Sequence, residues 1–197
     1  ARVNPAVPAQ NVKEFLAHVR ANPGKFNDGI GGGQAELDFG SMVKLANLNM
    51  VGVRYSGGPQ LITGVLGGEV HIMVTGLASA KSFMDSGKLR AIAISSGETF
   101  PGLVGAENLS LMSDEIPGYR GSSAWWGLMG PAGMPEPIVR KIAVACATSW
   151  RAEPLRARMR ELLILPAAGG TAELRDRIIA DVENTKKQVQ QTGVTPR

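Results

Sequence analysis

The sequence is poor in the residue types that most often carry catalysis or hold metals. It contains one cysteine, Cys146, and two histidines, His18 and His71, which lie far apart in different predicted elements. A single cysteine excludes an intrachain disulfide and a cysteine-cluster metal site. The G-x-S-x-G, H-E-x-x-H, C-x-x-C and P-loop patterns are also absent. We therefore expect binding without turnover, with no catalytic residue, cofactor or resident metal, and structural roles for both histidines.

Aromatic residues and clustered charge are scarce as well. The five Phe, two Tyr and three Trp are scattered, and the net charge of +4 includes no cationic run longer than Lys186–Lys187. Nucleic-acid surfaces concentrate basic and stacking residues, so we exclude nucleic acid as a partner. No apolar run approaches the ~18 residues of a membrane helix, and residues 1–5 carry no signal-peptide pattern. We expect a mature or truncated chain.

Short β-rich runs alternate with helical patterns over the first two-thirds of the 197 residues. Apolar side chains recur with helical spacing from Val12 to Val19, and Asn11 is a suitable N-cap. Extended runs are predicted at 25–30, 50–55, 70–75 and 89–95, with helices at 34–46, 59–66 and 78–85 between them. This alternation predicts an α/β layer of parallel strands joined by right-handed crossovers. After an irregular stretch at 96–121, we predict a strand at 123–129 and helices at 135–150, 153–163 and 172–192.

Three predicted strand-to-helix junctions are rich in glycine and hydroxyl residues: Gly29–Gln34, Tyr55–Gly58 and Thr75–Ser79. In a parallel sheet such junctions lie outside the carboxyl ends of the strands, where ligands bind. Backbone amides at helix N-termini hold anions there. Any one junction is equally compatible with a plain tight turn. The three together favour a cradle for a small anion.

The first junction also permits a nucleotide-binding interpretation. Gly29–Gly33 lies between a predicted strand and a predicted helix, as a dinucleotide loop does. The final glycine of that fingerprint is replaced by Gln34, whereas Arg54, near the end of the next strand, is placed to meet a ribose phosphate. A nucleotide-dependent α/β enzyme using Gly29–Gly33 therefore remains an alternative.

An ordered series of segments resembles the Bug-type extracytoplasmic solute receptors that serve tripartite tricarboxylate transporters. Each segment alone is weak, but their order along the whole chain is specific. They are Val3–Pro5, Val12–Glu14, Asn22–Asn27, Val53–Gly58, Leu66–Val70, Ser86–Ala93, Ile116–Tyr119, Trp126–Leu128, Gly130–Gly133 and Pro135.

The resemblance implies an α/β, periplasmic-binding-protein-like (type II) two-lobe fold. It implies that residues 5–121 form a complete second lobe, and that residues 1–4 and 122–197 are a crossover and a C-terminal helical part of a first lobe that is only partly present. The family's secretion signal and opening strand would lie upstream of Ala1. The implied protein is periplasmic, binds a small organic acid between its lobes and delivers it to membrane transporter subunits.

By the same resemblance, the carboxylate is held by backbone amides, hydroxyls and helix N-termini. Matched to this sequence, the ligand-binding residues are Gly31, Gly32, Gly33, Gln34, Ser56, Gly57, Gly58, Thr75 and Ser79. Ile30, Gly31 and Gln34 replace hydroxyl residues common in the family's first loop, and Leu37 stands near a histidine position. Thr75 falls where many relatives carry an acidic residue able to meet a ligand ammonium. We therefore expect a ligand without an amino group.

Two further expectations follow. A receptor-like fold can also serve as a sensor or interaction protein that transports nothing, and this stays a second alternative. If the first lobe is incomplete, apolar side chains such as Ile138, Ile142 and Leu163 lose their packing surface. Self-association of the chain is then expected.

Overall fold

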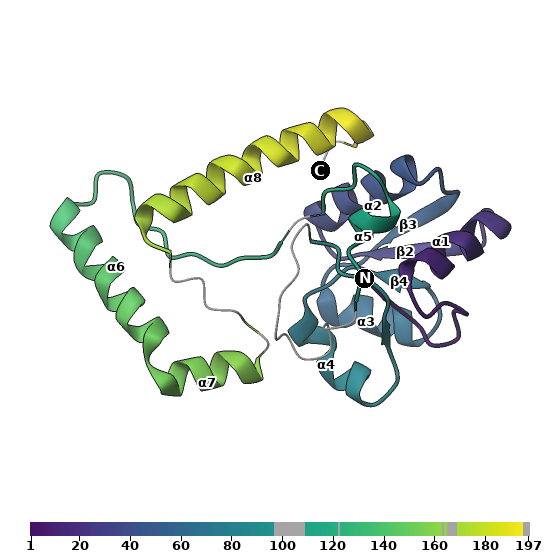
Figure 1. Cartoon of the computed structure of the whole chain (residues 1–197), viewed down its shortest axis with the longest axis horizontal. Helices are drawn as coiled ribbons and strands as arrows, with labels where there is room; N and C mark the ends of the chain where they lie inside the picture. Colours follow the sequence, from purple (N-terminus) through teal and green to yellow (C-terminus); the bar gives the residue numbers. More distant parts are fainter. Residues whose placement is uncertain (97–108, 122, 163, 165–168, 195–197) are drawn as a thin grey trace. The chain divides into compact units, whose positions relative to one another are not determined.

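The computed structural model describes residues 1–96, 109–121, 123–162, 164 and 169–194, and the chain forms two compact units (Figure 1). One unit comprises Ala1–Ser123 and Asn184–Arg197, and the other Ala124–Glu183. The chain thus leaves the first unit once and returns to it once. The assignment of 5–121 to one receptor lobe, and of 1–4 and 122–197 to the other, stays a prediction.

The first unit follows the predicted alternation of strands and helices. Its strands are β1 (Arg2–Val3), β2 (Phe26–Ile30), β3 (Met50–Arg54), β4 (Ile72–Met73) and β5 (Arg90–Ala91), and its helices are α1 (Val12–Ala21), α2 (Gly33–Leu45), α3 (Gly58–Leu66), α4 (Leu77–Asp85) and α5 (Met112–Glu115). The side chain of Asn11 caps α1 by accepting the backbone N–H of Glu14 at 2.9 Å, as predicted. The α/β class is confirmed.

The five strands form one sheet in the order β3-β2-β4-β1-β5. β2 pairs in parallel with β3 and β4, and Asp28 lies opposite both Gly52 and Ile72. The four predicted strands, β2 to β5, run in one direction, but the sheet also contains β1, which was not predicted and is antiparallel to β4 and β5. β1 precedes α1 and enters the sheet between two strands, so no helical crossover dictates its direction.

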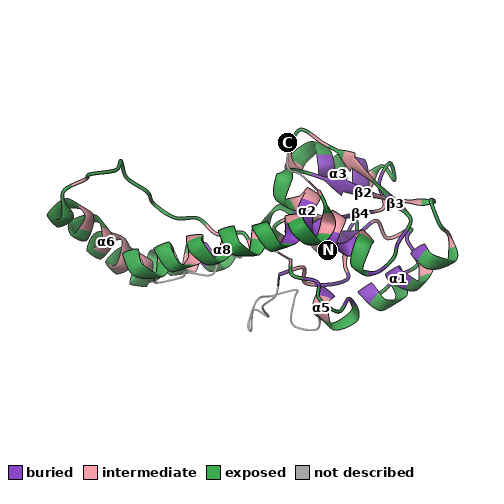
Figure 2. Ribbon diagram, turned by 90° about the horizontal axis from the view of Figure 1, so that it is seen from above, coloured by how far each residue is buried: buried purple, intermediate pink, exposed green. Residues whose placement is uncertain are grey.

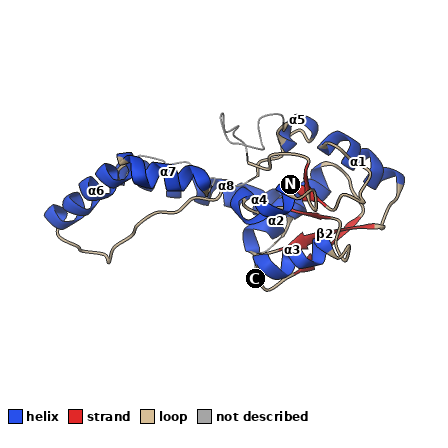
Figure 3. Cartoon of the chain, turned by 90° about the horizontal axis from the view of Figure 1, so that it is seen from below, coloured by secondary structure: helices blue, strands red, loops and turns tan. Residues whose placement is uncertain are grey.

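Helices cover both faces of this sheet (Figure 3). The adjacent residues Ile72 and Met73 of β4 point to opposite faces. Ile72 belongs to a core with buried side chains of α1, α2 and α5, whereas Met73 packs with buried side chains of α3 and α4. Because both faces are covered, a ligand could reach β2, β3 and β4 only at the strand ends, and in parallel α/β sheets ligands bind at the carboxyl ends.

The second unit contains α6 (Glu136–Arg151), α7 (Glu153–Glu161) and the first part of α8 (Thr171–Thr192), which continues into the first unit. The strand predicted at 123–129 is not formed: Ser123 and 124–129 make no strand pairing in the described chain. A strand needs a neighbour for its backbone groups, and here Trp126 and Leu128 are instead exposed. Leu163 lies outside the described residues. No described helix is both long and apolar enough to cross a bilayer.

Candidate functional site

The sheet brings the three predicted junctions to one edge. β2, β3 and β4 are neighbours and run in the same direction, so their carboxyl ends at Ile30, Arg54 and Met73 share that edge. The backbone N–H of Tyr55 donates to the carbonyl of Ile30 at 2.9 Å and fixes the second junction against the first. The buried guanidinium of Arg2 donates to the carbonyl of Thr75 and ties the third junction to β1.

Each of the helices that follow these strands begins on a glycine. The N-cap residues are Gly32 for α2, Gly57 for α3 and Gly76 for α4, and none makes a side-chain cap hydrogen bond. The first-turn N–H groups of a helix have no intrahelical acceptor and carry about half a positive charge. Three neighbouring helices therefore present uncapped amide groups at the carboxyl edge of the sheet.

The nine predicted ligand-binding residues all lie at this edge, and none is buried. Gly31, Gly32, Gly33, Gln34, Ser56 and Ser79 are exposed, while Gly57, Gly58 and Thr75 are half-buried. Two of the side chains have partners within the chain. The hydroxyl of Ser56 donates to the Gln60 amide oxygen, and Gln34 Nε2 donates to Asp38 Oδ1 and Gln188 Oε1. Their assignment to a ligand stays a prediction.

Arg54, which the nucleotide interpretation needs for a ribose phosphate, forms an ion pair with Glu36 in the first turn of α2. The Glu36 side chain is mostly buried and the Arg54 side chain mostly exposed. This pair sits between the first and second junctions. It neutralises the cation that would otherwise recognise a phosphate, and the sequence analysis did not identify Glu36 as its partner.

Sequence reasoning also missed three buried polar groups beneath the edge: Asp28, Asp38 and Tyr119. Burial raises the pKa of the Asp28 carboxyl well above its usual range. Burial, followed by the nearby carboxyls of Asp38 and Asp28, raises the pKa of the Tyr119 phenol. One signal was available for Asp38, because it shares the buried face of α2 with Ser41 and Met42, three and four residues later.

His71 makes its contacts with neighbouring residues of the fold. Its Nδ1 accepts the backbone N–H of Asn27 at 3.1 Å, its ring lies 5.0 Å from the ring of Phe26, and partial burial lowers the pKa of its imidazole. In the described part of the chain, no three His, Cys, Asp or Glu residues gather in a way that could hold a metal ion.

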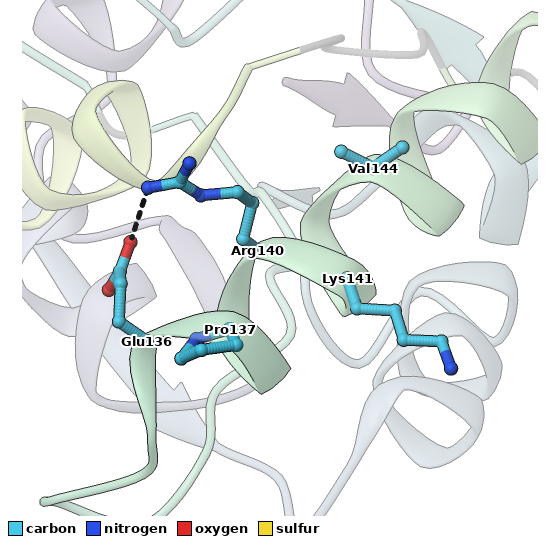
Figure 4. A pocket seen from close by; sticks show the side chains of 5 residues that line it. All are labelled: Glu136, Pro137, Arg140, Lys141 and Val144. Carbon is cyan, nitrogen blue, oxygen red and sulfur yellow. Dashed lines mark ion pairs between the residues drawn. The ribbon is translucent and has the colours of Figure 1, made fainter.

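Of two surface hollows, one lies away from the predicted residues, and the other borders the carboxyl edge at Ile30, Glu36 and Arg54. One runs along α6 and is lined by Glu136, Pro137, Arg140, Lys141 and Val144, with Arg140 and Glu136 paired at 3.7 Å (Figure 4). All five residues come from one helix, so this hollow is a surface groove. The other lies between α2 and β3, and Val194 lines it.

The solved structures with a similar fold include a periplasmic binding protein. The chain is similar to R. palustris Rpa4515 with adipate (TM-score 0.87, 20% identity), covering 100% of this chain and 65% of that one. It is also similar to the periplasmic binding protein BugD (TM-score 0.76, 21% identity), covering 100% and 66% of the two chains, and to MatC from Rhodopseudomonas palustris with bound malate (TM-score 0.72, 24% identity), covering 93% and 64%. The chain thus has the fold of periplasmic solute-binding proteins.

The chain belongs to the tripartite tricarboxylate transporter receptor family, whose family model matches residues 2–194. Among curated proteins it is 21% identical over 182 residues to the UPF0065 protein in the tcbD-tcbE intergenic region of a Pseudomonas species, covering 91% of this chain and 54% of that protein. A UPF0065 protein of Bordetella pertussis is 26% identical over 146 residues, covering 72% and 43%. The chain thus spans about half the length of these curated relatives.

These findings confirm the family resemblance and the periplasmic-binding-protein-like fold predicted from the sequence. The family and the structural neighbours are receptors, which supports a role other than catalysis. Proteins of this family are periplasmic binding proteins.

Proposed function

We propose that this chain supplies one wall of a receptor cleft that captures a small organic carboxylate for a tripartite tricarboxylate-type transporter. The observation that carries the proposal is that three helices with glycine at the N-cap, and so with uncapped amides, begin at the ends of three neighbouring parallel strands. Gly31–Gln34, Ser56–Gly58, Thr75 and Ser79 are its proposed ligand-binding residues.

Uncapped helix amides suit a carboxylate ligand because they recognise negative charge without a buried cation. A charge-assisted hydrogen bond contributes about 1.5–3 kcal/mol. Three helix termini can share the oxygens of one carboxylate or divide the two ends of a dicarboxylate between them. The similar structures with adipate and with malate hold ligands of this class.

In the proposed receptor, residues 5–121 form the second lobe, and residues 1–4 and 122–197 contribute the crossover and helices of the first. Lobe closure over the ligand then produces the form that the membrane transporter subunits recognise. The proposed location is the periplasm.

The two alternatives differ in what they predict. The nucleotide alternative using Gly29–Gly33 offers Arg54 to a ribose phosphate, but Arg54 is paired with Glu36. A sensor or interaction protein would bind the same ligands without a transporter. The first alternative is tested by ligand class, and the second by whether a transporter subunit binds the liganded receptor.

For this single wall of the cleft we expect a Kd for L-malate of about 1 mM. Titration to about 10 mM L-malate should then shift the backbone amide NMR signals of Gly31–Gln34, Ser56–Gly58 and Thr75–Ser79. The variant Gly32→Asp is expected to lose these shifts. Its carboxylate can cap α2 and repel the ligand, and the backbone φ of 165° at Gly32 suits any residue. Because an acidic cap stabilises a helix, the loss of binding should come with unchanged or higher stability.

Gly32→Ala is the matched control, since an added Cβ there meets nothing within 4 Å. L-Aspartate, which replaces the malate hydroxyl with an ammonium, should bind more weakly because Thr75 offers it no charge. Tight aspartate binding would contradict the expectation of a ligand without an amino group. Shifts caused by ATP and not by malate would contradict the receptor proposal itself.

The second unit carries the proposed self-association. Met159 is its one buried hydrophobic residue within the described part of the chain, while Ile138 and Ile142, one turn apart on α6, are 49% and 38% exposed. No residue of α6 is buried (Figure 2). Light scattering should show a concentration-dependent rise in mass that Ile138→Lys together with Ile142→Lys reduces, with the exposed Lys141→Ala as control. A concentration-independent monomer would contradict it.

A further inference from the structure

Helix α8 has a single buried residue, and that residue is polar. All 22 residues of the helix lie within the described part of the chain, and only Gln188 is buried, at 5% exposure. A buried amide is costly unless its donors and acceptor are all satisfied. The environment of Gln188 therefore shows what the C-terminal part of α8 is anchored to.

Gln188 makes hydrogen bonds with every polar atom of its side chain. Its Nε2 donates to Asp38 Oδ1 at 3.3 Å and to the carbonyl of Arg120, and its Oε1 accepts from Gln34 Nε2 at 3.2 Å. Gln34 Nε2 also lies 3.4 Å from Asp38 Oδ1. Asp38 is only 3% exposed, so these amide donors solvate a buried carboxyl group.

The three partners of Gln188 occupy particular places in the chain. Gln34 directly follows the Gly31–Gly33 loop and lies in the first turn of α2, and Asp38 lies one turn later. Arg120 is three residues before Ser123, where the chain leaves the first unit, and Gln188 follows its return at Asn184 by four residues. One side chain thus joins the outgoing segment, the returning helix and the glycine loop.

We propose that Gln188 is a positioning residue. It links the segments where the chain leaves and re-enters the first unit to the first turn of α2, which follows the ligand loop. A displacement of the C-terminal part of α8 has to move the first turn of α2 with it, or break hydrogen bonds to a buried carboxyl group. The amide groups that follow Gly32 are thereby held in one arrangement. This inference rests on the proposed function for the role of the loop, but the coupling itself is measurable without ligand.

Hydrogen exchange followed by NMR on the ligand-free chain tests the coupling. In Gln188→Ala, the amides of Glu36, Leu37 and Asp38 are expected to exchange about tenfold faster or more, as the loss of hydrogen bonds to a carboxyl group predicts. Gln190→Ala, an exposed residue on the same helix, is the matched control. The amide of Leu61, in the first turn of α3, should not change in either variant.

Two further variants separate positioning from packing. Gln188→Glu places a second carboxyl group against Asp38 and should accelerate exchange in α2 as well. Asp38→Asn combined with Gln188→Glu restores an amide–carboxylate pair at residues 38 and 188 but leaves the Arg120 carbonyl without its donor, so exchange in α2 should recover only in part. The proposal is overturned if Gln188→Ala accelerates exchange only in α8. Failure of malate to bind would leave these exchange results unaffected and would contradict only the proposed function.

Discussion

Replacing Phe15 with alanine is expected to lower the free energy of unfolding of the first unit by about 3–5 kcal/mol. Phe15 is completely buried between α1 and the sheet, and its ring meets that of Phe26 edge to face at a centroid distance of 6.0 Å. The alanine variant loses the apolar burial, the aromatic pair and the packing around the vacated space. No other single truncation in α1 removes as much buried volume.

Val51→Ala is the control, because Val51 is 57% exposed on β3 and should change stability by less than about 0.5 kcal/mol. Urea unfolding should be followed by far-UV circular dichroism or hydrogen exchange. Tryptophan fluorescence is unsuitable because Trp125, Trp126 and Trp150 all belong to the second unit. Equal unfolding free energies for the two variants would show that the α1 core is not the main support of the sheet.

The helices α1 to α4 could be predicted because each carries its own local pattern, whereas the four-residue helix α5 lies in the stretch at 96–121 that was predicted to be irregular. The apolar spacing from Val12 to Val19 and the Asn11 cap specify α1 without reference to any other segment. β1 could not be predicted, since two residues are too few to show alternation and their pairing depends on β4 and β5. The run at 123–129 shows the converse: an apolar pattern typical of a strand forms none where no neighbouring strand pairs with it.

In the candidate site, too, one part could be predicted from the sequence and another could not. The glycine junctions were recognisable because a predicted strand, one to three consecutive glycines and a predicted helix follow one another. The parallel order of β2, β3 and β4 then brings the three junctions to one edge. The contact of Gln188 with Asp38 spans 150 residues and has no local signature. Burial of these polar side chains is decided by tertiary packing, which the sequence pattern of α8 does not reveal.

Gly121→Ala is expected to lower the unfolding free energy of the first unit by about 2–3 kcal/mol, because the backbone atoms that an added Cβ would meet cannot move aside at low cost. An alanine Cβ would lie 1.8 Å from the carbonyl oxygen of Ser95 and 3.0 Å from Tyr119. The first contact is with backbone, so a side-chain rotation cannot relieve it. The segment must move away and lose the parallel bridge between Gly121 and Ser96.

The consequence should extend beyond stability, because the neighbouring carbonyl of Arg120 is an acceptor for Gln188. A displaced Gly121 should therefore also accelerate amide exchange at residues 184–192, at the end of α8. Gly32→Ala is the matched control: it makes the same chemical change at a position with open space and an extended backbone, and should leave both readouts unchanged. If Gly121→Ala unfolds at the same urea concentration as Gly32→Ala, the close approach of residue 121 to Ser95 does not hold the outgoing segment in place. Faster exchange at 184–192 together with lower stability would show that the Gly121–Ser95 contact and the Gln188 hydrogen bonds form one cooperative structure. That structure lies where the chain leaves the first unit and returns to it.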